Sequence, residues 1–119
     1  MKLAQISVNV KDLDRAKAFY RDALNLPFLF EAPRLAFFDA GGVRLMLSPP
    51  ERPEFDHPGS ILYYQVPEIG KAYEEMKARG VRFDGVPHVV HRDARHELWM
   101  VSFRDTEGNI LQLMQPKPI

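Results

Sequence analysis

The opening of the chain alternates apolar and polar side chains, which is the pattern of a strand with one buried face. The alternation covers Leu3 to Val10. Its two faces hold Ile6, Val8 and Val10 on the apolar side, and Gln5, Ser7 and Asn9 on the polar side. The pattern therefore predicts a half-buried strand over residues 3–10.

A helix is predicted directly after this strand. Asp12 is a favourable N-cap residue, and apolar side chains then recur at helical spacing. Asn25 can adopt the left-handed conformation that ends a helix, and Pro27 prevents its continuation. The predicted buried stripe consists of Leu13, Ala16, Phe19, Tyr20, Ala23 and Leu24. Three short strands are expected to follow, at residues 28–31, 35–39 and 43–48.

A proline-rich segment separates this first half from a second half with the same order. Residues 49–59 contain four prolines among charged residues, so we expect a linker with no regular element. The second half is predicted as a strand at 61–66, a helix at 68–79 ended by Gly80, strands at 81–91, 97–103 and 110–115, and a frayed tail at 116–119. The chain is thus interpreted as one domain, residues 1–119, with module one at 1–48 and module two at 60–119.

The closing segment of each half supports a repeat. Residues 99–113 read as strand, tight turn and strand, with turn-forming residues between Asp105 and Asn109. Residues 37–47 are a fainter copy. Matching the two copies puts Gly42 on Gly108 and Met46 on Gln112, and matching the openings of the halves puts Gln5 on Ile61.

Composition narrows the classes of function. The chain has 119 residues, 16 basic and 16 acidic side chains and no cysteine. Balanced charge argues against nucleic acid or an anionic membrane as the main partner. Without cysteine there is no disulfide, thiolate nucleophile or zinc–thiolate site. The N-terminus enters the first strand without a signal-peptide core, and no apolar run could span a bilayer, so we expect a cytoplasmic protein.

Two βαβββ modules in this length resemble the vicinal-oxygen-chelate superfamily, which includes glyoxalase I, bleomycin resistance proteins and extradiol dioxygenases. The resemblance is carried by the opening (Asp12-Leu13, Ala16, Phe19-Tyr20, Leu24) and by residues 103–113. It implies an α+β fold in which curved mixed sheets surround a cavity and the helices cover the convex side. The side chains expected beneath the helices are Ile6, Val8, Val10, Leu45, Leu47, Leu111 and Leu113.

The resemblance also identifies the positions where metal-dependent members carry their ligands. These positions fall on Gln5, Met46, Ile61 and Gln112 in this sequence. Methionine and isoleucine cannot hold a hard divalent ion, and a neutral glutamine is a weak ligand. We therefore expect no cofactor and neither glyoxalase I nor extradiol dioxygenase chemistry. The alternative is a divalent metal held by Gln5, Gln112, His91 and His96.

Three histidines near the predicted hairpin in the second half are further candidates. A four-residue loop at 92–95 would place His91 and His96 opposite each other, close enough to share a proton or a metal. The alternative is an exposed hairpin end with two ordinary imidazoles. His88 and His91 are three residues apart on a strand, which predicts opposite faces. His88 lies deeper in the strand and is a candidate base, or else a hydrogen-bonded structural residue.

Uncharged polar side chains and one arginine are predicted to face the cavity. Amides and hydroxyls offer directional hydrogen bonds, and Arg44 offers a bidentate clamp for a carboxylate or phosphate. Trp99 shares the parity of Phe103, so it belongs either to the apolar wall or to the core under the helix. The candidate ligand-binding residues are Gln5, Ser7, Asn9, Arg44, Met46, Tyr63, Met100 and Gln112, with Met114 as a further wall residue.

Four phenylalanines cluster in the second and third predicted strands. Phe28, Phe30, Phe37 and Phe38 either form the core of module one or, where they face outward, mark a subunit contact. The resemblance favours a homodimer.

Three functions remain open at this point. The first is a metal-free protein that binds a small, partly apolar metabolite or drug. The second is a lyase, isomerase or dioxygenase with an atypical site built from Gln5, Gln112 and a histidine. The third is an interaction module, which no sequence feature specifically supports.

Overall fold

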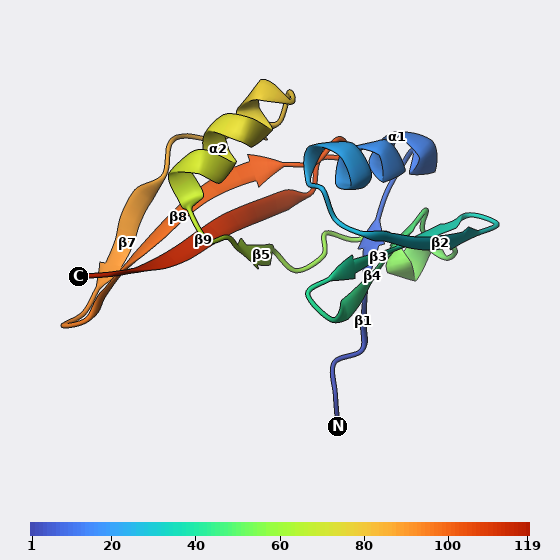
Figure 1. The fold of residues 1–119 in the computed structure, drawn as a ribbon. Helices are drawn as coiled ribbons and strands as arrows, with labels where there is room; N and C mark the ends of the chain where they lie inside the picture. Colours follow the sequence, from blue (N-terminus) through green and yellow to red (C-terminus); the bar gives the residue numbers. More distant parts are fainter. The chain divides into compact units, whose positions relative to one another are not determined.

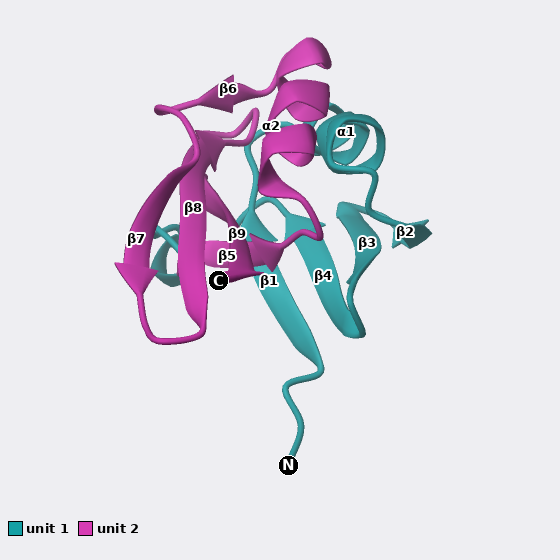
Figure 2. Cartoon of the chain, turned by 60° about the vertical axis from the view of Figure 1, so that its left-hand side comes forward, with its two compact units in different colours: residues 1–59 teal, residues 60–119 magenta.

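The computed structural model describes residues 1–119, which form two compact units at residues 1–59 and 60–119 (Figure 2). The boundary coincides with the predicted start of module two. Each unit has the α+β composition expected from the sequence, with one mixed sheet and one principal helix on one face of that sheet. That the two units form a single domain stays a prediction.

Unit 1 contains a four-stranded sheet in the order β1-β4-β3-β2. β1 and β4 pair in parallel, and the other neighbours pair antiparallel. The helical part lies on one side of this sheet (Figure 1). Its elements are β1 (Gln5–Asn9), α1 (Leu13–Ala18), a π-helical segment (Phe19–Ala23), β2 (Phe28–Ala32), β3 (Leu35–Ala40) and β4 (Val43–Ser48).

Unit 2 repeats this arrangement with a five-stranded sheet. β5 pairs in parallel with β9, β9 pairs with β8, and β8 pairs with both β6 and β7. In Figure 1, α2 lies over β8 and β9. The elements are β5 (Leu62–Gln65), α2 (Ile69–Ala78), β6 (Arg82–Phe83), β7 (His88–Arg92), β8 (His96–Arg104) and β9 (Ile110–Pro118).

The helix signals in the sequence act as predicted. The Asp12 carboxylate accepts a hydrogen bond from Arg15 N at 3.0 Å and so caps α1. Asn25 has φ of 55°, the left-handed conformation expected after the helical region. Helix α2 starts differently. The side chain of its N-cap residue, Glu68, makes no capping bond, and the Gln115 side chain in β9 instead accepts a hydrogen bond from Ile69 N at 2.8 Å.

The seven predicted side chains beneath the helices belong to the core or its margin. Val10, Leu45, Leu47, Leu111 and Leu113 are each at most 2% exposed. Val8 is also buried, and Ile6, nearest the sheet end, is partly buried. Burial of this apolar face is the main stabilising term for each unit.

Three predictions about elements were wrong. A short 3₁₀ helix (Pro53–Phe55) forms in the linker, because Phe55 N and Asp56 N bond to the carbonyls of Arg52 and Pro53. The strand predicted at 81–91 is two strands, β6 and β7. The tail is not frayed: β9 continues to Pro118, paired with His96, and Ile119 N donates to Arg95 O.

One buried carboxylate, that of Asp105, stabilises the turn of the closing hairpin in unit 2. Asp105 accepts hydrogen bonds from Glu107 N, Asn109 N and Asn109 Nδ2 at 2.8–2.9 Å. Gly108 in this turn has φ of 87°. The fainter copy in unit 1, residues 37–47, has the same kind of turn with fewer hydrogen bonds. There Asp39 accepts a hydrogen bond from Gly42 N at 2.9 Å, and Gly42 has φ of 95°. The repeat inferred from the sequence is therefore a repeat of turn geometry.

Candidate functional site

The candidate residues of unit 1 share the sheet face that lies away from its helix, which we call open face 1. Strand register pairs Gln5 with Arg44 and Ser7 with Met46. Asn9 has the same parity as Gln5 and Ser7. The intervening residues, including Val8 and Leu45, are buried on the helix side. The structure thus brings together the five unit-1 residues that the sequence assigned to one polar face.

Several side chains hold Arg44 in place on open face 1. Its Nε donates to Gln5 Oε1 at 2.8 Å, and its guanidinium carbon lies 5.2 Å from the ring centroid of Phe37 and 5.9 Å from that of Phe30. The two rings stack on each other with centroids 4.3 Å apart. Gln5 Nε2 in turn contacts the Met46 sulfur at 3.6 Å. A cation on an aromatic pair, fixed by an amide, forms the centre of this face.

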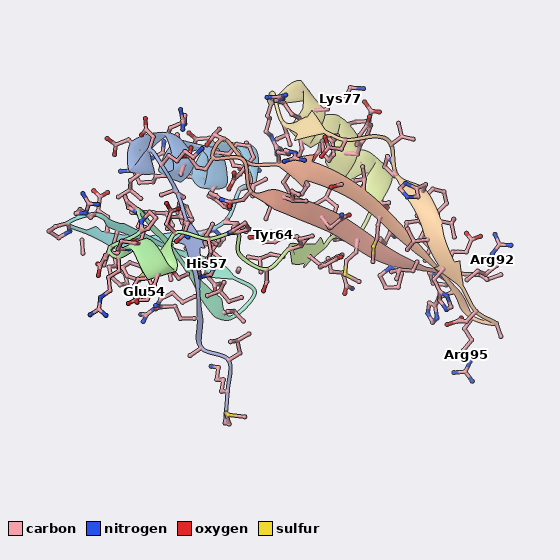
Figure 3. The ribbon with its side chains drawn as sticks, turned by 180° about the vertical axis from the view of Figure 1, so that it is seen from behind. Glu54, His57, Tyr64, Lys77, Arg92 and Arg95 are labelled. Carbon is pink, nitrogen blue, oxygen red and sulfur yellow. The ribbon has the colours of Figure 1, made fainter.

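Asn9 holds the linker against the end of β1. Its side-chain amide donates to the carbonyl oxygens of Phe55 and His57, which follow the start of the 3₁₀ helix. Figure 3 shows Glu54 and His57 in this segment of unit 1. The Asn9 amide, predicted to contact a ligand, therefore makes structural hydrogen bonds to the chain itself.

The candidate residues of unit 2 also share one sheet face, which we call open face 2. Tyr63 pairs with Gln112, and Gln112 pairs with Ser102, so the three lie in one row across β5, β9 and β8. The next row holds Gln65, Met114 and Met100. Tyr63 is 51% exposed, whereas Gln112, Met100 and Ser102 are half-buried. Ile61 precedes β5 and is 44% exposed, outside these rows.

A bulge in β7 overturns the predicted opposition of His88 and His91. His88 pairs with Met100 and Val89 with Trp99, but the next pair is His91 with Leu98, which leaves Val90 as an extra residue. Because Leu98 and Met100 share a face of β8, the bulge puts His88 and His91 on the same face, that of Met100. The Nδ1 of His88 lies 2.9 Å from Val86 O. A carbonyl only accepts, so Nδ1 carries a proton, and in the neutral form of the ring Nε2 is the acceptor.

Of the two alternatives for His91 and His96, the face-to-face pair does not form. The β7–β8 turn is tighter than a four-residue loop, because Arg92 pairs with Glu97 and Asp93 N bonds to His96 O. His96 is therefore opposite Asp93, and His91 is opposite Leu98. Hydrogen bonds from Arg95 N and His96 N hold the pKa of Asp93 below its usual range. Figure 3 shows Arg92 and Arg95 projecting at this hairpin end.

Trp99 belongs to the helix side and not to an apolar wall of the open face. It shares the strand parity of buried Val101 and Phe103, and Lys117 lies over its ring at 4.2 Å. Ser102, Phe30 and Phe37 are face residues that the sequence did not single out as contacts. Their partners were predicted as ligand-binding residues: Gln112 pairs with Ser102, and Arg44 contacts Phe30 and Phe37. Ser102 could have been found from the sequence, because it has the same strand parity as Met100.

The residues at the four metal positions fit a divalent ion poorly. The single side-chain oxygen of Gln5 accepts a hydrogen bond from the Arg44 cation, so a metal there would meet like charge. Met46 offers only a thioether, and Ile61 offers no donor. No group of three or more His, Asp or Glu side chains is arranged to hold a metal ion.

None of the helices has the length and apolar character needed to cross a bilayer. No curated protein sequence matches the chain. Several solved structures share its fold. A lactoylglutathione lyase from Agrobacterium tumefaciens is 20% identical, with a TM-score of 0.77 over 96% of this chain and 92% of that chain.

Two further structures match the chain with similar sequence identities and TM-scores. A glyoxalase/bleomycin resistance protein/dioxygenase superfamily member from Sphaerobacter thermophilus is 20% identical, with a TM-score of 0.83 over 97% of both chains. An antibiotic binding protein from Streptomyces sp. CB03234 is 24% identical, with a TM-score of 0.76 over 98% of this chain and 97% of that chain. The sequence model of the Glyoxalase/Bleomycin resistance protein/Dioxygenase superfamily matches residues 2–113. The chain therefore belongs to this superfamily.

Proposed function

We propose that this protein binds a small, partly apolar molecule on its open sheet faces without the help of a metal ion. Open face 2 carries the proposal. There a row of hydrogen-bonding side chains, Tyr63, Gln112 and Ser102, adjoins a row with two methionines. Mixed apolar and directional polar groups are typical of small-molecule sites. A protein of the same fold that is described as antibiotic binding supports this class of function.

A fluorescence titration with phenylnaphthylamine, a neutral apolar dye, tests the proposal. We expect saturable binding to the wild-type protein and at least severalfold weaker binding by Tyr63→Ser and Gln112→Ala. Lys71→Ala, an exposed change in helix α2 on the other side of the sheet, is the matched control and should bind like wild type. Absence of saturable binding to the wild-type protein, or equal binding by all variants, would contradict the proposal.

The metal-free part of the proposal has its own test. It rests on Arg44, which donates to the only oxygen that Gln5 could offer a cation. We expect elemental analysis after incubation with Zn²⁺, Mn²⁺, Fe²⁺ or Ni²⁺ and desalting to find much less than one ion per chain. One ion per chain that Gln5→Ala or Gln112→Ala removes would overturn it.

A second candidate function, an enzyme with an atypical site, is favoured by the β7 bulge. The bulge keeps His91 on the face of His88 and Met100, the same face that carries Gln112. The free Nε2 of His88 could accept a proton from a bound substrate. For any substrate that the wild-type protein turns over, His88→Ala should lower kcat by at least about a hundredfold. Unchanged turnover in His88→Ala and Gln112→Ala would exclude this function.

We further propose a homodimer located in the cytoplasm. The dimer is supported by exposed apolar side chains on edge strand β2, where Phe28, Leu29 and Phe30 are 41%, 47% and 45% exposed. Edge strands with such side chains are prone to pair with another chain.

A further inference from the structure

The Arg44 side chain on open face 1 is fixed in place but keeps unused donors. The hydrogen bond to Gln5 and the two ring contacts hold its stem and Nε. The terminal nitrogens Nη1 and Nη2 have no hydrogen-bond partner within the chain. A guanidinium held at one edge presents its opposite edge as a preorganised fork.

No carboxylate neutralises this cation. Asp39 is opposite Arg44 in the β3–β4 pairing, but its Oδ1 accepts a hydrogen bond from Gly42 N, and no ion pair joins it to Arg44. Five other arginines (Arg21, Arg52, Arg79, Arg92 and Arg104) have a carboxylate oxygen within 4 Å. Exposed Arg34 and Arg95 also lack an ion pair, but no aromatic ring or side-chain acceptor fixes them. Arg44 therefore combines a fixed position with a charge that no ion pair neutralises.

The surroundings of Arg44 indicate which ligand would use these donors. Phe30 is 45% exposed and lies against buried Phe37, so the cation adjoins an accessible aromatic surface. Met46 and Ser7 lie in the adjoining row. Oxyanions with two neighbouring oxygens match the guanidinium fork, and flat apolar groups match the ring and the thioether.

We infer that open face 1 binds a flat apolar molecule with one anionic group, a carboxylate or sulfonate, which is held by the Nη atoms of Arg44 with its apolar part against Phe30 and Met46. This inference rests on the proposed binding function and specifies its ligand class. Gln5 acts as a positioning residue, because it orients the guanidinium through Nε and leaves the fork for the anion.

Two dyes that differ only in one anionic group provide the test. Anilinonaphthalene sulfonate and phenylnaphthylamine have the same aromatic body, with and without a sulfonate. We expect wild type to bind the sulfonate at least about tenfold more tightly than the neutral dye, since a charge-assisted bidentate contact is among the strongest hydrogen bonds. Arg44→Gln should abolish this preference, whereas Arg34→Gln should retain it.

A structural role for Arg44 predicts a different pattern. If Arg44 only covers the aromatic pair, Arg44→Gln should change the affinity for both dyes equally, and this would overturn the inference. A wild-type protein that binds both dyes with equal affinity would overturn it as well, while the proposed binding function would stand. If neither dye binds, both proposals fail. Circular dichroism of each variant shows that it is folded, and Arg44→Lys should restore only part of the preference because lysine lacks the fork.

Discussion

At the scale of single residues, the alternation of side chains along each strand decides which of them reach the open faces. It placed Gln5, Ser7 and Arg44 on one face, and it identified Trp99 as a possible core residue because Trp99 has the same parity as Phe103. Parity failed at His91, where one extra residue, Val90, reverses the alternation. Nothing in Val89-Val90 distinguishes a bulged from a regular strand, since both residues favour extended backbone. The contacts of Arg44 with Phe30 and Phe37 also needed the pairing of β2, β3 and β4, which the sequence does not specify.

Tyr64 carries a prediction about stability and pH. Its hydroxyl is buried without a hydrogen-bond partner, and burial, with a smaller effect of the Asp105 charge, raises the pKa of Tyr64 from 10.0 to about 12. Because the folded-state pKa exceeds the unfolded one, this group's contribution to stability is fully present below pH 10 and is lost as the pH rises toward 12. Tyr64→Phe removes the unpaired hydroxyl. We expect its free energy of unfolding at neutral pH to be unchanged or about 1 kcal/mol higher.

Two measurements check this. Urea unfolding compares wild type and Tyr64→Phe at pH 7 and at pH 10.5, and the advantage of the variant should grow with pH. An absorbance titration of the tyrosines should lose its latest step in Tyr64→Phe. A variant that is destabilised by more than 1 kcal/mol at pH 7 would mean that the hydroxyl does have a partner in solution.

At the scale of elements, the predictions were best where an end signal was local. Asp12 and Asn25 delimit the first helical region as expected. The predictions of element bounds were least accurate where pairing with a strand distant in the sequence decides where an element ends. The break between β6 and β7 includes Gly85 at φ of 135°, and Asp84 N bonds to Ser102 O in β8. Likewise, residues 116–118 are ordered because β8 is long enough to pair with them, although their position at the chain end predicted a frayed tail.

The start of α2 depends on Gln115, a residue of another element. Gln115 Oε1 accepts the hydrogen bond of Ile69 N that an N-cap side chain would normally accept. Gln115→Ala should therefore lower the free energy of unfolding by about 1 kcal/mol, the usual effect of losing a cap. Gln115→Glu keeps an acceptor oxygen and adds a favourable charge near the helix N-terminus, so it should retain most of the stability. Urea denaturation distinguishes the two variants, and equal losses in both would contradict the capping role.

The contact between Asn9 and the linker predicts protection from proteolysis. The Asn9 side-chain amide donates hydrogen bonds to the backbone carbonyls of Phe55 and His57. Asn9→Ala removes these bonds, so residues 49–59 should become more accessible to a protease. Limited proteolysis followed by mass spectrometry should show several times faster cleavage in this segment. His57→Ala is the matched control, since it changes the side chain but keeps the carbonyl that Asn9 binds. If both variants are cleaved at the wild-type rate, the Asn9 contact does not restrain the linker.

At the scale of the whole molecule, the repeat made the fold predictable and left the function open. Two glycines at positive φ, Gly42 and Gly108, follow aspartates that bond back to the turn, and this shared geometry underlies the resemblance between the halves. Function could not follow from the same signal, because the residues after the turns differ: Met46 occupies the position of Gln112. A superfamily fold hosts many chemistries, and its side chains decide among them.

The free edge of β2 argues for association of two chains. β2 pairs only with β3, and its three consecutive apolar residues, Phe28 to Phe30, are each more than 40% exposed. An antiparallel pairing of β2 with a second copy would bury this edge and place Leu29 near its own counterpart. Sedimentation velocity should then give the mass of two chains for wild type and of one chain for Leu29→Glu, because a charge on an edge strand opposes pairing. Val86→Glu, a charge at an apolar residue that is 62% exposed outside the strands, should remain dimeric. A wild-type monomer across micromolar concentrations, or a Leu29→Glu dimer, would show that this edge serves no such contact.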